Sequence, residues 1–97
     1  MSKIFVLIQI ISVFVFAETL QCNAVLLKAK YYSDRAVSEL KKSNPDYCIV
    51  ADNLEQQLNW LGSAKRYCSN PDNVRAANEL IVKLTPALMT ATQKCGH

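Results

Sequence analysis

The sequence has 97 residues, of which 51% are hydrophobic, and it carries a formal net charge of +3. A chain of this length builds one hydrophobic core, which excludes two independent domains. The small positive charge argues against nucleic-acid binding, because proteins of that class gather basic side chains on one face. Four cysteines and an apolar N-terminal segment point to a small secreted domain held together by disulfides.

Residues 1–17 have the pattern of a secretory signal peptide, with a positive start, the apolar run 4–16 and a small residue, Ala17, at the cleavage site. The run is shorter than the about 20 residues of a membrane-spanning helix, so no stable membrane anchor is expected. Cleavage after Ala24 is an alternative, but it would leave an odd number of cysteines. We therefore predict a secreted, extracellular protein in which 18–97 form a single helical domain.

The rest of the sequence predicts three main helices, at about 22–42, 45–61 and 71–95. In each segment apolar residues recur three or four positions apart, and no strand-like alternation occurs. The protein should be all-α, a small up-down helical bundle, and the third helix, with the widest apolar arc, should be central. The predicted core stripes are Val25, Ala29, Tyr32, Ala36 and Leu40; Tyr47, Val50, Ala51, Leu54, Leu58 and Leu61; and Val74, Ala77, Ile81, Leu84, Leu88, Ala91 and Cys95.

Local signals place the helix ends. The tetrapeptide Ser-Asn-Pro-Asp occurs at 43–46 and again at 69–72, and it predicts two helix starts, because Asn suits the N-cap, Pro the first helical position and Asp the first turn. Gly62 is predicted to end the second helix, followed by a short helical connector at 63–68. Pro86 removes a backbone donor inside the third helix and predicts a kink there.

The four cysteines are predicted to form two disulfides. In an up-down bundle, Cys22 and Cys68 fall at one end, whereas Cys48 and Cys95 fall at the other. Bridged Cα atoms lie about 4.4 to 6.8 Å apart, so we predict the pairs Cys22 with Cys68 and Cys48 with Cys95. These bridges would supplement a small core.

The inventory of reactive residues argues against catalysis. The only histidine is His97, and the only glycines are Gly62 and Gly96. Catalytic triads built on histidine, two-histidine metal sites and glycine-rich phosphate loops are therefore excluded. We predict no enzymatic activity, no cofactor and no metal ion.

Two groups of side chains fall away from the predicted core, one on the first helix and one on the second. Exposed aromatic and aliphatic residues beside polar ones are typical of protein-binding hot spots. The structural alternative is packing against neighbouring segments, with Trp60 under residues 62–70 and with Leu27 and Tyr31 against residues 18–24, while the basic residues form a solvated face. The candidate binding residues are Leu27, Lys28, Tyr31, Arg35, Ile49 and Trp60.

By exclusion, the sequence favours a secreted, non-enzymatic interaction protein that binds another macromolecule, an extracellular protein, in a body fluid or secretion. One alternative is a carrier, in which the helices enclose a small hydrophobic ligand. A further alternative is a membrane-active, antimicrobial protein, because the helices are amphipathic.

Overall fold

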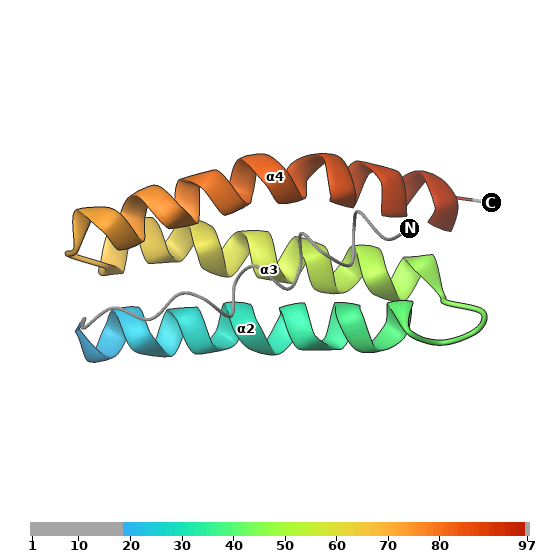
Figure 1. Ribbon diagram of the computed structural model, residues 1–97, viewed down its shortest axis with the longest axis horizontal. Coiled ribbons are helices and arrows are strands. Elements are labelled where there is room, and N and C mark those ends of the chain that lie inside the picture. Colours follow the sequence, from blue (N-terminus) through green and yellow to red (C-terminus); the bar gives the residue numbers. More distant parts are fainter. Residues whose placement is uncertain (1–18, 97) are drawn as a thin grey trace.

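The computed structural model describes residues 19–96, which fold into three α-helices with short connections. Consecutive helices run in opposite directions and lie side by side (Figure 1), so the predicted all-α up-down bundle is confirmed. The predicted signal peptide and His97 lie outside the described residues. The helices are α2 (Leu20–Leu40), α3 (Tyr47–Tyr67) and α4 (Pro71–Cys95).

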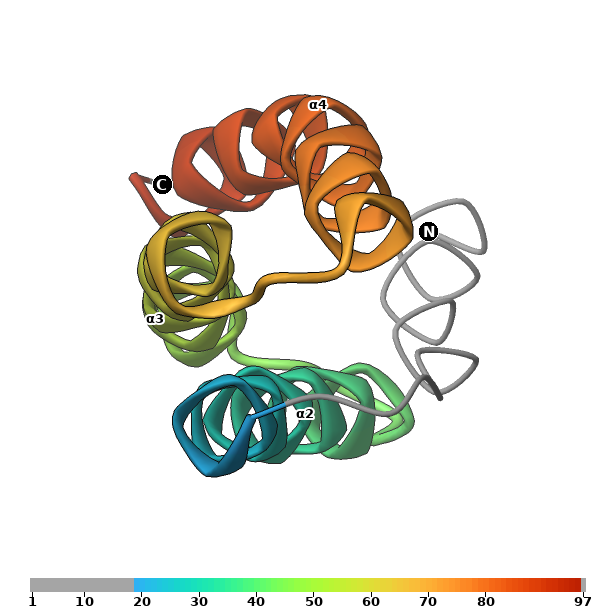
Figure 2. The same ribbon diagram turned by 90° about the vertical axis from the view of Figure 1, so that its left-hand side faces the viewer.

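The central helix is α3, not the third helix as the sequence predicts. α3 packs against both neighbours, whereas α2 and α4 scarcely contact each other, and the end-on view shows these two apart (Figure 2). The prediction is wrong because Val82 and Met89, which widen the apolar arc of α4, are exposed. In contrast, α3 buries the polar side chains of Asn53 and Gln57, which a count of apolar residues overlooks.

The core consists of inward residues spaced by three and four on each helix, as in a heptad pattern. On α4 the prediction is only partly right: Ala77, Leu84 and Ala91 are buried, but Ile81 and Leu88 are half-buried. The helix is therefore rotated slightly from the predicted orientation. The fully inward residues of α4 are Asn73, Ala77, Leu80, Leu84, Ala87 and Ala91.

The predicted connector at 63–68 is wrong, because α3 continues through Gly62 to Tyr67. The backbone at Gly62 has no positive φ, so this glycine does not form a helix end. Leu61, Ala64 and Cys68 instead continue the inward spacing and are buried. Burial of these side chains favours extension of the helix by further turns.

The second copy of the repeated tetrapeptide starts α4 as predicted. Asn70 is the N-cap, and its side-chain oxygen accepts a hydrogen bond from the backbone N–H of Asp72 at 2.9 Å. Pro71 occupies the first helical position, where a missing N–H costs nothing.

The first copy acts differently, and the predicted cap at Asn44 is wrong. The N-cap of α3 is Asp46, whose carboxylate accepts hydrogen bonds from the backbone N–H of Cys48 at 2.9 Å and of Ile49 at 3.4 Å. The backbone N–H of Asp46 donates to the Glu39 carboxylate at 2.9 Å. The Asp46 N–H, which an N-cap at Asn44 would have to accept, is therefore already bonded to Glu39. The helix begins at Tyr47, two residues after the predicted start.

Helix α4 passes through Pro86 without a break, and Figure 1 shows that it is bent. Two threonine hydroxyls donate to carbonyls one turn earlier, Thr85 to Ile81 at 2.7 Å and Thr90 to Pro86 at 3.1 Å. Such bonds often accompany bent helices. The prediction of a single helix through Pro86 is confirmed.

Both predicted disulfides are present. Cys22 is bonded to Cys68 with Cα atoms 4.7 Å apart, and Cys48 is bonded to Cys95 with Cα atoms 4.6 Å apart. The bridges lie at opposite ends of the bundle. Thr19 caps α2 at the first end, where its hydroxyl oxygen accepts the N–H of Cys22 at 3.1 Å.

Candidate functional site

The outer face of α2 carries a line of exposed apolar side chains. Leu20, Leu27 and Tyr31 are spaced by seven and four residues, which places them on one face of the helix. Leu27 is 66% exposed and Tyr31 is 52% exposed. The buried side chains of α2, such as Val25 and Ala29, lie on the opposite face. The apolar line therefore contributes nothing to the core.

Arg35 connects this line to α3. Its Nη1 donates to the Tyr31 hydroxyl at 3.2 Å, and the guanidinium carbon lies 5.5 Å from the centre of the Tyr31 ring. Its Nε donates to Asn53 Oδ1 at 3.2 Å, while Asn53 Nδ2 donates to the backbone carbonyl of Ile49 at 2.9 Å. Both hydrogen-bond partners of Arg35 are neutral, so the network orients its positive charge without neutralising it.

The antiparallel packing of α2 and α3 extends this contact along both helices. Lys28 precedes Arg35 by seven residues, and Trp60 follows Asn53 by seven residues. Seven residues are two helical turns, so Lys28 lies on the same face of α2 as Arg35, and Trp60 lies on the same face of α3 as Asn53. Because the two helices are antiparallel, Lys28 and Trp60 then lie at about the same height along the bundle, two turns from the contact between Arg35 and Asn53. The predicted candidates on α2 and α3 therefore lie along one seam. We call this set the α2–α3 surface: Leu27, Lys28, Tyr31, Arg35, Ile49 and Trp60.

The members of the α2–α3 surface differ in exposure. Ile49 is exposed, as are Lys28 and Arg35. Trp60 is half-buried and packs against the core, so only part of its ring is accessible. Residues 62–67 of the segment predicted to cover it belong to α3 itself.

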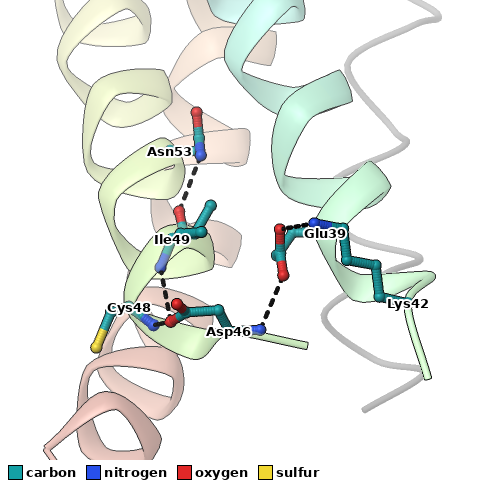
Figure 3. Close-up of polar contacts among 6 residues, drawn as sticks. All are labelled: Glu39, Lys42, Asp46, Cys48, Ile49 and Asn53. Carbon is teal, nitrogen blue, oxygen red and sulfur yellow. Dashed lines mark hydrogen bonds and ion pairs between the residues drawn. The ribbon is translucent and has the colours of Figure 1, made fainter. Parts of the chain in front are cut away.

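At one end of this surface, Glu39 joins α2 to the start of α3 (Figure 3). Its buried carboxylate accepts the backbone N–H of Asp46 at 2.9 Å and pairs with Lys42 Nζ at 2.9 Å. The hydrogen bond from Asp46, followed by the interaction with Lys42, lowers the pKa of Glu39 below its ordinary value. The carboxylate therefore stays ionised and holds the connection between the helices.

The core also contains a polar group that sequence reasoning missed. Gln57 is fully buried on α3, and among the described residues neither its Nε2 nor its Oε1 has a hydrogen-bond partner. Its position gives the only available signal: it continues the inward spacing from Leu54 to Leu61. Asn53, one turn earlier, is buried as well but has both hydrogen bonds described above.

Within residues 19–96, no three His, Cys, Asp or Glu side chains gather where they could hold a metal ion. No helix in this range combines the length and hydropathy that a membrane crossing requires. Comparisons with known proteins give no match: no family model, no curated protein and no solved structure is similar to the chain.

Proposed function

We propose that this protein is a secreted, non-enzymatic protein that binds another extracellular protein through the α2–α3 surface. The observation that carries the proposal is the network of Arg35, Tyr31 and Asn53, which holds an uncompensated positive charge beside exposed apolar side chains. Arginine and tyrosine are enriched in binding hot spots, and side chains that are already ordered lose less entropy on binding.

The chemistry of the surface defines its partner. Leu27 and Ile49 offer apolar contacts, whereas Lys28 and Arg35 offer positive charge. A complementary protein would present an apolar patch with one or more carboxylates, and arginine can bind a carboxylate with two parallel hydrogen bonds. Nearby Lys30 is already paired with Asp34 at 2.9 Å and adds less.

Secretion is supported by the apolar run 4–16 after a positive start. Two disulfides in a small helical bundle are compatible with an oxidising, extracellular environment.

The test is a binding screen of the oxidised protein against a displayed library of extracellular proteins, followed by affinity measurements on each hit. Tyr31→Ala and Arg35→Ala should each weaken binding by about tenfold or more, the loss typical of a hot-spot residue. Met89→Ala is the matched control, because Met89 is 60% exposed but lies on α4. Hits that bind both α2 variants at full affinity would contradict the proposal.

A second candidate function, the carriage of a small amphiphile, is favoured by Gln57. Its amide has no hydrogen-bond partner among residues 19–96 and lies on the inward face of α3, while α2 and α4 scarcely contact each other. A ligand with an apolar body and a hydroxyl or protonated carboxyl group could enter between α2 and α4 and bond to both amide atoms.

Native mass spectrometry after incubation with a long-chain alcohol or fatty acid tests the carrier function. A complex that the wild type forms and Gln57→Leu does not form would support it. No complex with the wild type, or equal complexes with both proteins, would count against it.

A further inference from the structure

The loop between α2 and α3 presents two consecutive lysines, Lys41 and Lys42, both of them exposed. The backbone hydrogen bonds of α2 end at Lys42, whose N–H donates to the carbonyl of Glu39 at 3.2 Å. In the described chain, hydrogen bonding resumes only at Asp46, whose N–H donates to the Glu39 carboxylate. The peptide bond between Lys42 and Ser43 therefore lies in an exposed, non-helical segment.

A second pair of basic residues provides an internal comparison. Lys65 and Arg66 are also exposed, but they lie in the last turn of α3. A protease binds its substrate as an extended strand, so a helical site must unwind before it is cut. The two pairs match in charge and exposure and differ in backbone conformation.

We propose that the Lys42–Ser43 bond is a proteolytic processing site for a secretory protease that is selective for paired basic residues. Such a protease carries carboxylates in the pockets that take the two side chains before the cleaved bond. Exposed loop tips are preferred sites of proteolytic cleavage. The inference depends on the secretion proposed above but not on the binding surface.

The reaction is a hydrolysis. The C–N bond between Lys42 and Ser43 breaks, water supplies OH to the Lys42 carbonyl carbon, and its remaining proton goes to the Ser43 nitrogen. The disulfide between Cys22 and Cys68 spans the cut. The product is therefore a two-chain protein, with α2 in one chain and α3 and α4 in the other, joined by one covalent bridge.

Glu39 controls access to this bond. Its carboxylate contacts Lys42 before the bond and Asp46 after it, so the loop must release both contacts to extend into a protease. Replacement of the carboxylate by an amide removes the ion pair and weakens the hydrogen bond. Glu39→Gln should therefore be cleaved severalfold faster than the wild type, because cleavage follows the population of the open loop.

The experiment treats the oxidised, full-length secreted protein with a purified subtilisin-like protease of this selectivity and follows its intact mass. Without reduction, the product should gain the mass of one water. After reduction, it should separate into one chain ending at Lys42 and another beginning at Ser43. Lys42→Ala should abolish this cut, and Arg66→Ala, the matched control, should leave its rate unchanged.

Three outcomes would overturn the proposal. The protein could stay intact while the same protease cleaves a reference peptide that contains residues 38–46. Cleavage after Arg66 could be as fast as cleavage after Lys42. Lys42→Ala could be cut in the loop at the wild-type rate. None of these outcomes bears on binding through the α2–α3 surface, which the library screen tests on the uncut protein.

Discussion

Replacement of the buried Gln57 by leucine should make this protein more stable. The amide is fully buried, and neither of its polar atoms has a partner among the described residues. A polar group buried without hydrogen bonds costs about 1 to 3 kcal/mol in proteins. Leucine has a similar size and no polar atoms, so Gln57→Leu should raise the free energy of unfolding by about 1 to 3 kcal/mol, less any cost of imperfect packing.

The matched control is Asn53→Leu, on the same helix one turn away. Asn53 is also buried, but its amide donates to the Ile49 carbonyl and accepts from Arg35. Leucine leaves the Ile49 carbonyl with its helical backbone bond but removes the acceptor of the charged Arg35 Nε, so Asn53→Leu should lower the free energy of unfolding by about 1 to 3 kcal/mol. The opposite signs expected for the two changes separate hydrogen bonding from burial.

The assay is urea unfolding of the oxidised proteins, followed by circular dichroism and analysed at constant slope. The proteins should first be refolded from denaturant without lipid, since a bound ligand would stabilise the wild type alone. A Gln57→Leu protein as unstable as Asn53→Leu would refute the reasoning, because it would mean that the Gln57 amide is satisfied in the native state.

Three further predictions concern the helix ends and the connection between α2 and α3. Gly62→Ala should stabilise the protein by about 0.5 to 1 kcal/mol in urea unfolding, because Gly62 lies inside α3 and a Cβ there meets nothing within 4 Å beyond its chain neighbours and the helix's own backbone; a loss of stability would contradict this reasoning. Asn70→Ala should cost about 1 kcal/mol and Asn44→Ala less than about 0.5, since only Asn70 caps a helix; equal thermal-unfolding losses would contradict this. The lowered pKa of Glu39 means that its stabilisation is present above its ordinary value of 4.5 and is lost as the pH falls through the lower folded value. Glu39→Gln should therefore flatten the decline of urea midpoints as the pH falls below 4.5, and parallel declines would argue against it.

The disulfide pairing could be predicted because it follows from coarse geometry. A helix of about 20 residues spans about 30 Å, which far exceeds the distance between bridged cysteines. Once three antiparallel helices are assigned, Cys22 can reach Cys68 but not Cys95 without a reversal of the chain. The errors of two residues at the ends of α2 and of six residues at the end of α3 do not change this result.

The order of packing could not be predicted, because it depends on which polar side chains are buried. Gln57 and Asn53 look like surface residues by composition, although they occupy inward positions of α3. Val82 and Met89 look like core residues, although they face away from it. Residue type indicates how unfavourable the burial of a side chain is, but the arrangement of the helices decides which side chains are buried.

The two copies of the tetrapeptide show that a local sequence pattern is also not enough to assign the N-cap of a helix. Both offer Asn as an N-cap, but only Asn70 acts as one. The difference arises from Glu39, seven residues before Asp46 and on another helix, which binds the Asp46 N–H. A capping rule applied within four residues cannot include that contact.

The candidate site was partly predictable. Leu27 and Tyr31 could be recognised as exposed because they lie opposite the apolar stripe of their own helix. The link from Arg35 through Asn53 to Ile49 joins two helices, so it needs the register between them, which the spacing within each helix does not specify.

The disulfides also determine where this bundle can open. One joins α2 to the end of α3, and the other joins α4 to the start of α3. Neither joins α2 to α4, and these two helices scarcely contact each other. Separation of α2 from α4 therefore strains no disulfide and breaks few backbone contacts, whereas separation of either helix from α3 strains a disulfide and disrupts the packing of that helix. An amphiphile that reaches Gln57 should enter between α2 and α4, and the α2–α3 surface should remain assembled while it does.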